Sequence, residues 1–405
     1  MPDPFARWLE LQRAARPGWM SALAVFCAFM AIVYTPWDIF LKPVALDEEI
    51  WFGISFRGWA AKVTAIPHWF VYAAGAYGFW RLRPWMWPWA PLYVGQVAFS
   101  MLIWGLLTLE GFDGKLIALV TAVPFAFLTW VLVAERERFR PEPPDLRVRY
   151  GDWALVTGAS AGLGTAFATR LAELGLSVVL TARREERLRA LAADLERRFE
   201  VQTRVVAVDL GEPGAAERLA DEVDDLEIGV LVNNAGFGMA GRYVRQDPDR
   251  LSAMITLNCV SPVSLTRRLL PAMVERGRGA VIMVASIAGN QPVPLNGVYS
   301  ATKAFDRFFG EMLWAEMLGS GVDVLVLEPG PTETEFQDVA GETAHAGEPP
   351  EQVVRTALDA LGRQPSVVSG WGNWIRSLGA RVLPRSIAVL VAGRVMAQWT
   401  PAERR

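Results

Sequence analysis

The chain has 405 residues, a formal net charge of −3 and 52% hydrophobic residues. The length allows two or three domains, and the slightly acidic balance argues against a nucleic-acid partner. Only two cysteines (Cys27, Cys259) and two histidines (His68, His345) are present. This composition argues against a disulfide framework, a metal site and a histidine-based catalytic triad.

Four apolar segments in the first third of the chain are each about long enough to cross a bilayer core of about 30 Å. They cover residues 18–34, 59–80, 89–109 and 116–134, and 12 of the 17 tryptophans precede residue 131. We therefore predict that residues 1–134 form an all-α membrane domain with four transmembrane helices. Buried helices of a soluble core are the alternative, but four such segments in succession are rare in soluble folds.

Two polar residues interrupt the second segment, Lys62 and His68, on either side of Pro67. One hypothesis is a lipid or ion site inside the helical bundle. The other, which we favour, is that Lys62 extends toward the outer surface and His68 pairs with a neighbouring helix.

The charges between the apolar segments predict an orientation. Basic residues lie before the first segment, between the second and third, and after the fourth: Arg7, Arg13, Arg16, Arg81, Arg83, Arg136, Arg138 and Arg140. The other two loops carry Asp38, Asp47, Glu48, Glu49, Glu110 and Asp113. The positive-inside rule then places both termini in the cytoplasm, at the inner or cell membrane. A cleaved signal peptide is the rival for the first segment, but no small-x-small site follows it, which favours a retained anchor.

Residues 135–149 read "ERERFRPEPPDLRVR", a charged and proline-rich linker. After it the pattern changes, because short β-branched runs such as "WALVTG", "SVVLTA" and "AVIMVAS" alternate with helical stretches. Continuous apolar strands between helices predict a parallel sheet that is covered on both faces. We therefore predict an α/β, Rossmann-type doubly wound domain over residues 150–370.

The first unit of this domain contains a glycine-rich turn between a strand and a helix. Gly158, Gly162 and Gly164 follow the pattern G-x-x-x-G-x-G. Such glycines let the backbone approach a pyrophosphate, and the following helix start offers amide donors. A glycine-rich turn without a ligand is the alternative.

The end of the second strand bears on which dinucleotide binds. An NAD site usually places an acidic residue there, to hold the ribose 2′-hydroxyl. Here that position is Ala182, and Arg183 and Arg184 follow. Because arginine can bind a 2′-phosphate through paired hydrogen bonds, we predict NADP(H), with Arg183 as the contact. Arg184 has the competing interpretation of a solvated helix start.

Motifs in the rest of the domain resemble the short-chain dehydrogenase/reductase family. They are "TGASAGLG", "VDL" with Asp209, "NNAG" from Asn233, "LNCVSP", "VASIAG", "YSATK" and "EPGPTETEF". The resemblance implies four catalytic residues: Asn258, Ser286, Tyr299 and Lys303. With the glycine turn and Arg183, the cofactor contacts become Gly158, Ser160, Gly162, Leu163, Gly164, Arg183, Asp209, Asn234, Ala235, Gly236, Tyr299, Lys303, Pro329, Gly330, Thr332 and Thr334. The N-terminal apolar region is not part of the family pattern.

The chemistry of ketone reduction agrees with these residue types. Tyrosine has an ordinary pKa near 10, which makes it a slow acid or base at neutral pH. An ammonium one helical turn away lowers that pKa, and Lys303 is so placed relative to Tyr299. Ser286 can hydrogen-bond the substrate oxygen. The resemblance gives Asn258 the task of holding a water that passes protons to the lysine.

Residues 335–352, after the P-G motif, are expected to form a mobile lid over the substrate. Residues 371–405 mix tryptophans and aliphatic residues with arginines, which is typical of an amphipathic helix on a membrane surface. A C-terminal helix that packs on its own domain, or at a dimer interface, fits equally well.

We expect a membrane-anchored NADP(H)-dependent oxidoreductase that acts on a hydrophobic carbonyl or hydroxyl compound, such as a lipid ketone, a 3-oxoacyl chain or a steroid. The resemblance also implies a homodimer or tetramer. A second hypothesis makes the helical bundle a lipid-binding or transport module that an NADP-sensing domain regulates. A third makes the bundle only an anchor.

Overall fold

A computed structural model describes residues 6–7, 16–83, 85–139 and 145–405, without the side chains of Glu137 and Arg381. The chain divides into two compact units, Asp3–Pro143 and Pro144–Arg405. Arg13, Arg140 and the three linker prolines, which entered the predictions of orientation and linker, lie outside the described residues.

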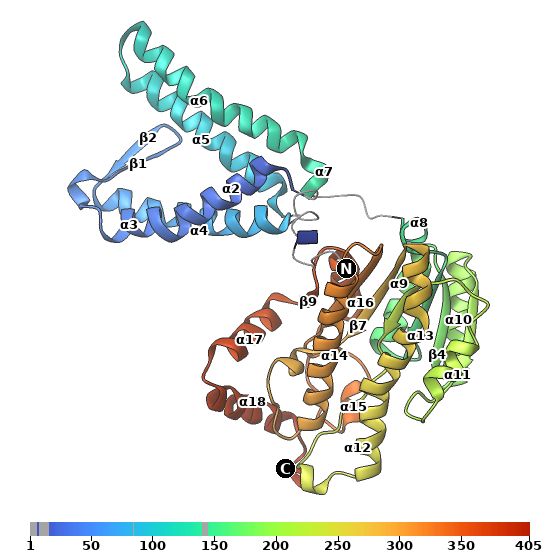
Figure 1. Cartoon of the computed structure of the whole chain (residues 1–405). Coiled ribbons are helices and arrows are strands. Elements are labelled where there is room, and N and C mark those ends of the chain that lie inside the picture. The colour runs from blue at the N-terminus through green and yellow to red at the C-terminus, as the bar shows by residue number, and fades with distance from the viewer. Residues whose placement is uncertain (1–5, 8–15, 84, 140–144) are drawn as a thin grey trace. The chain divides into compact units, whose positions relative to one another are not determined.

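The first unit is helical, with one short β-hairpin. Its elements are α2 (Gly18–Phe29), a π-helical turn (Met30–Tyr34), α3 (Thr35–Phe40), β1 (Glu48–Trp51), β2 (Ile54–Arg57), α4 (Trp59–Arg81), α5 (Met86–Thr108), α6 (Gly111–Ala134) and α7 (Arg136–Phe139). Helix α2 lies beside α4, and α5 lies beside α6 (Figure 1). The first helical stretch continues beyond the predicted end at residue 34, since the π-helical turn leads directly into α3 and the helix runs on to Phe40.

Three segments of the described chain are long and apolar enough to cross a membrane. They are Gly18–Phe40, Met86–Thr108 and Gly111–Ala134. Helix α4 covers the second predicted span and has 23 residues, but it is not among these three. The number of four spans therefore stays a prediction.

The two polar residues of α4 have partners within the unit. Lys62 is buried and forms an ion pair with Asp47 of the preceding loop, at 2.9 Å. Asp47 also pairs with Lys42, at 2.8 Å. Lys62 therefore does not extend to the surface, because the loop folds onto it and neutralises its charge. His68 Nδ1 lies 2.5 Å from the hydroxyl of Tyr93 in α5, as expected for pairing with a neighbouring helix.

The second unit confirms the predicted Rossmann-type fold. Its seven parallel strands run in the order β5-β4-β3-β6-β7-β8-β9. They are β3 (Trp153–Thr157), β4 (Ser177–Ala182), β5 (Thr203–Ala207), β6 (Ile228–Asn233), β7 (Gly279–Val284), β8 (Val322–Glu328) and β9 (Ser366–Val368). The order reverses direction after β3, so the crevice between the carboxyl ends of β3 and β6 is the expected place for a ligand.

Helices cover both faces of this sheet (Figure 1). One buried core joins the sheet to α9 (Gly162–Glu173), α10 (Glu185–Phe199) and α16 (Pro350–Ala360). The other joins it to α11 (Ala215–Asp221), α13 (Ser261–Arg276) and α14 (Gly297–Glu316). Shorter elements are α8 (Leu146–Tyr150), α12 (Pro248–Ile255), a π-helical turn (Thr256–Val260) and α15 (Phe336–Ala340).

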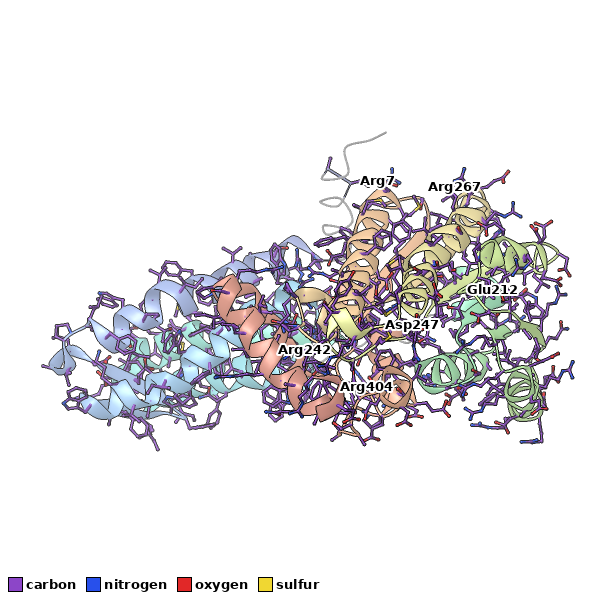
Figure 2. All side chains as sticks on the ribbon, turned by 90° about the horizontal axis from the view of Figure 1, so that it is seen from below. Arg7, Glu212, Arg242, Asp247, Arg267 and Arg404 are labelled. Carbon is purple, nitrogen blue, oxygen red and sulfur yellow. The ribbon has the colours of Figure 1, made fainter. Side chains whose placement is uncertain are left out.

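The C-terminal segment forms α17 (Trp371–Val382) and α18 (Arg385–Trp399), which pack on the second unit. Backbone hydrogen bonds hold its end: Thr343 N donates to Trp399 O at 2.7 Å, and Arg242 N donates to Arg404 O at 2.9 Å. Figure 2 shows Arg242 and Arg404 close together. The structure shows this segment packed on its own domain, and its contact with a membrane or with a second copy stays a prediction.

Candidate active site

A cleft of about 750 Å³ opens where the strands β3, β4, β6, β7 and β8 end. The predicted site residues that line it are Gly158, Ser160, Gly162, Leu163, Arg183, Asp209, Asn234, Ala235, Gly236, Ser286, Tyr299, Lys303, Pro329, Gly330, Thr332 and Thr334. Gly164 and Asn258 do not line the cleft but stand next to Gly158 and Gly236, which do. One cavity thus brings the predicted catalytic and cofactor residues together.

The backbone of the glycine turn (residues 158–164) has a shape that lets a ligand approach it closely. Gly158 and Gly162 have φ angles of +70° and +54°, which favour glycine. A Cβ on Gly164 would lie 2.1 Å from the carbonyl oxygen of Gly158. Helix α9 begins at Gly162, so its free amide groups point toward the ligand side of the turn. Thr157 fixes the neighbouring strand end, because its hydroxyl accepts hydrogen bonds from the backbone N–H of Asn234 (2.8 Å) and Ala235 (2.9 Å).

The two arginines after β4 both line the cleft but have different partners. Arg184 hydrogen-bonds the Ser160 hydroxyl of the glycine turn at 3.2 Å and pairs with Glu335 at 2.7 Å. The Arg183 side chain is 69% exposed and lies 3.6 Å from the Asp209 carboxylate. Arg183 is therefore the less engaged of the two, whereas Arg184 is more than a solvated helix start, because it braces the turn.

The proton-transfer residues converge from three elements. Ser286 follows β7; its hydroxyl accepts from Ala288 N at 3.1 Å and donates to Pro329 O at 3.3 Å. Tyr299 and Lys303 lie one turn apart on α14, and both are buried. The Lys303 ammonium lies 5.9 Å from the Tyr299 ring centre and donates to the Val284 carbonyl at 2.8 Å.

Asn258 lies in the π-helical turn and is completely buried. Its Oδ1 accepts from Phe237 N at 3.2 Å, and its Nδ2 donates to Phe237 O at 3.1 Å and to the Thr302 hydroxyl at 3.0 Å. This side chain ties the loop after β6 to α14 beside Lys303. Its task of holding a proton-carrying water stays a prediction.

Burial controls the acidity of Tyr299. Burial raises the pKa of Tyr299, and the Lys303 ammonium and the Ser286 hydroxyl oppose that increase without cancelling it. The predicted effect of Lys303 on the pKa of Tyr299 therefore has the expected direction, but the cost of an anion in a buried site is larger, so the net pKa lies above its ordinary value. A tyrosine that keeps its proton is suited to donate it.

Asp306 is a further member of the site that the motifs did not predict. It is buried on the same helix, and its Oδ2 accepts from Lys303 Nζ at 2.9 Å. Burial lowers the pKa of Lys303, but Asp306 and Tyr299 outweigh that effect, so the net pKa lies above its ordinary value. The spacing of three residues on one helix was the available signal.

The far end of the cleft is formed by segments without motifs. Phe336 of α15 packs against the Tyr299 ring with the ring centres 5.3 Å apart. Glu342 pairs with His345 at 3.2 Å, and the His345 ring stacks on Trp399 of α18 at 4.1 Å. These contacts hold part of the predicted lid against the C-terminal helix. Its mobility stays a prediction.

Comparisons with known proteins agree with this geometry. Residues 152–345 match the short chain dehydrogenase family. The chain is 34% identical to the very-long-chain 3-oxoacyl-CoA reductase of Homo sapiens, over 56% of this chain and 77% of that protein. It is also 34% identical to the 7β-hydroxysteroid dehydrogenase of Collinsella aerofaciens, over 56% of this chain and 90% of that protein.

Two solved structures extend the comparison. A 7β-hydroxysteroid dehydrogenase superposes with a TM-score of 0.58 and 31% identity, and covers 62% of this chain and 99% of its own. A short-chain dehydrogenase from Sphingobium yanoikuyae in complex with NADPH superposes with a TM-score of 0.52 and 32% identity, and covers 57% of this chain and 93% of its own. The fold and the Ser-Tyr-Lys site define an oxidoreductase domain. The chain belongs to the short-chain dehydrogenase family.

Proposed function

We propose that this chain is a membrane-anchored, NADPH-dependent reductase of a hydrophobic ketone, such as a lipid ketone, a 3-oxoacyl chain or a steroid. The observation that carries the proposal is a single cleft in which Tyr299, Ser286 and Lys303 lie beside the glycine turn. The relatives with 3-oxoacyl-CoA reductase and hydroxysteroid dehydrogenase names support a hydrophobic substrate.

The cleft fits a dinucleotide with a 2′-phosphate. Glycines at 158 and 162 let the turn pack closely on the neighbouring loops, since a Cβ on Gly158 would lie 2.8 Å from the Asn234 side-chain amide and one on Gly162 would lie 2.7 Å from the Thr334 side chain. The end of β4 offers Arg183 and Arg184 instead of a carboxylate. The relative in complex with NADPH supports the same cofactor.

Each residue then has a defined task. NADPH supplies the hydride for the carbonyl carbon. The Tyr299 hydroxyl donates its proton to the carbonyl oxygen as negative charge develops there, and the Ser286 hydroxyl holds that oxygen in place. Lys303 keeps a positive charge beside the tyrosine and offers ammonium hydrogens to the cofactor ribose.

The substrate side of the cleft supports an apolar ligand. Several small or apolar side chains of the C-terminal helices line it: Ala380, Leu383, Ala388, Val391, Ala392, Val395, Met396 and Trp399. An aliphatic chain or a fused-ring compound would bury its surface against these groups.

The first test is turnover of a lipid extract by the purified full chain with NADPH, followed by nicotinamide absorbance and mass spectrometry. Tyr299→Phe should lower turnover about 10²- to 10⁴-fold, because it removes the proton donor, while NADPH affinity stays the same. NADPH binding without turnover of any carbonyl compound would contradict the reductase. A Tyr299→Phe protein that keeps every cellular effect would instead favour the regulated lipid-binding or transport module.

We also propose that α4 is a fourth span and that the catalytic unit lies in the cytoplasm. Helix α4 lies along α2 and is as long as α5. The ion pair of Lys62 with Asp47 removes the main charge penalty near its start. An even number of spans agrees with arginines on both sides of the helical region.

A homodimer or tetramer is the proposed assembly. Phe305, Phe308 and Met312 on α14 are exposed apolar side chains, and Val274 on α13 adds to them. Light scattering of the purified protein, with Phe308→Glu as the test variant, should show dissociation if α14 lies at the interface. An unchanged molar mass would place the interface elsewhere.

A further inference from the structure

The outer surface of α17 and α18 exposes an unusual amount of apolar area for a helix pair at the edge of a Rossmann domain. Trp371, Val382 and Leu390 are 80%, 72% and 70% exposed. The other exposed large apolar side chains of this surface are Trp374, Ile375, Leu378 and Ile387, whereas Leu383, Val391 and Val395 are exposed at the border of the cleft. An apolar patch of this kind marks a binding surface rather than a solvent face.

The inner side of the same helices is part of the active-site cleft. Ser377 and Ala380 of α17 and Ala388, Ala392 and Met396 of α18 are buried and line the cavity. The two helices thus form a wall one helix thick between the cleft and the apolar outer surface. The small side chains of Ala380, Ala388 and Ala392 on the inner side leave room for a ligand beneath them.

The positive charge of the segment indicates which kind of partner would bind this surface. Residues 371–402 contain four arginines and no aspartate or glutamate. Arg385 and Arg394 are exposed beside the apolar side chains, and Arg376 is exposed at the border of the cleft. Tryptophans and aliphatic residues with flanking arginines are suited to an anionic membrane surface, and three candidate membrane spans belong to the same chain.

We propose that α17 and α18 dock on an anionic bilayer surface, and that the hydrophobic substrate passes from the bilayer between these helices into the cleft. The substrate route rests on the proposed reductase function, but the docking does not. Docking itself is independent of turnover. A second copy of the chain is the competing occupant, and the tests separate the two.

Docking is tested by a spin label on the full chain in nanodiscs that contain phosphatidylglycerol. Leu390→Cys carries the label, and Ala190→Cys, at an exposed position of α10, is the control. Cys27 is buried and Cys259 half-buried, so labelled protein without an added cysteine gives the background. At residue 390 we expect more collisions with oxygen than with a water-soluble nickel complex, and the reverse at residue 190.

Two outcomes would overturn docking. If the nickel complex reaches the label at residue 390 as readily as at 190, the surface faces water. If neither reagent reaches it, and the label gains dipolar broadening that disappears on dilution with unlabelled protein, another copy covers the surface.

The substrate route is tested by kinetics on two ketones, a long-chain ketone dissolved in the nanodisc and a short water-soluble one. Leu390→Asp should raise the KM for the long-chain ketone at least tenfold and change kcat/KM for the short ketone less than twofold. Ala190→Asp should change neither. Because Leu390 is 70% exposed, the variant should keep its unfolding temperature, and Leu390→Gln repeats the test without the charge.

Equal KM values for Leu390→Asp and wild type on the long-chain ketone would overturn the route through α17 and α18. A wild-type protein that reduces neither ketone would contradict the proposed function instead, and the spin-label result would still stand.

Discussion

At the scale of single residues, the site depends on the buried positive charge of Lys303. Lys303 and Asp306 are both buried, 2.9 Å apart, on one helix. Removal of a carboxylate from such a pair leaves a positive charge without compensation, which favours loss of the proton. Asp306 is thus a positioning residue, because it holds the lysine in its charged form beside the reacting tyrosine.

We expect Asp306→Asn to weaken NADPH binding at alkaline pH. In the wild type, Asp306 helps to raise the pKa of Lys303, so the ammonium persists as pH increases. In the variant, burial lowers the pKa of Lys303, so the lysine loses its charge earlier as pH increases. NADPH affinity should then decline at a pH about one unit or more below the pH of the decline in the wild type. NADPH fluorescence titrations between pH 6 and 10 measure this shift.

Glu316→Gln, at the exposed end of α14, is the control with the same change of charge. It should leave the pH profile in place. A profile for Asp306→Asn that is weaker at every pH by one constant factor would indicate a packing defect and not a charge effect.

The pH profile of the reductase follows from Tyr299. Burial raises the pKa of its hydroxyl, so the protonated donor persists through neutral pH, and reduction is lost only as pH rises past this pKa. We expect kcat/KM for ketone reduction to stay flat from pH 6 to about 9 and to fall only as the pH passes the ordinary tyrosine value near 10. A decline that begins below pH 8 would contradict this assignment of the proton donor.

Residue patterns gave different amounts of information about the site. Tyr299, Lys303 and the glycine turn were predictable because their chemistry needs fixed spacings along one element. The net pKa of Tyr299 was not, because burial depends on residues that arrive from other parts of the chain, such as Phe336. Glu342 and His345 carried no motif, and only the packing against Trp399 places them in the cleft.

At the scale of elements, the parallel strands were predictable from continuous apolar runs, since such runs between helices are typical of a sheet covered on both faces. The C-terminal helices were harder. Their mixture of arginine, tryptophan and aliphatic residues fits packing as well as membrane contact, and in the structure α18 buries one side against the cleft and exposes apolar side chains on the other.

The glycine turn offers a sharp test at this scale. Gly164→Ala would place a methyl group 2.1 Å from the Gly158 carbonyl oxygen, so the turn must shift. We expect NADPH affinity to fall at least about tenfold, or 1.4 kcal/mol. Gly372→Ala in α17, where a Cβ meets nothing within 4 Å, should bind NADPH normally. Circular dichroism checks that both variants are folded, and normal affinity in Gly164→Ala would contradict this assignment of the turn.

At the scale of the whole molecule, the side of the membrane on which the catalytic unit lies depends on whether α4 crosses the bilayer. Three candidate spans alone would put the two ends of the helical region on opposite sides, and α4 restores an even number. The sequence predicted four spans from apolar length. Composition alone could not settle α4, because Lys62 and Arg81 lie near its ends and its partners come from the preceding loop.

Reporter fusions after Gly53 and after Arg83 decide the number of spans. With α4 across the membrane, a phosphatase that is active only outside the cytoplasm should be active after Gly53 and inactive after Arg83, and a cytoplasmic fluorescent reporter should show the reverse. The same activity at both positions would mean that α4 does not cross. A phosphatase fusion after Glu110 should again be active if α4 crosses and inactive if it does not, which gives a second reading of the same question.

The apolar outer side of α18 also affects how the reaction rate would depend on concentration. A substrate that reaches the cleft from the bilayer is counted per lipid molecule and not per litre. Adding inert phospholipid at a constant amount of substrate and enzyme would then slow the reaction, although the bulk concentrations of substrate and enzyme stay the same. A ketone that arrives through water would show no such surface dilution.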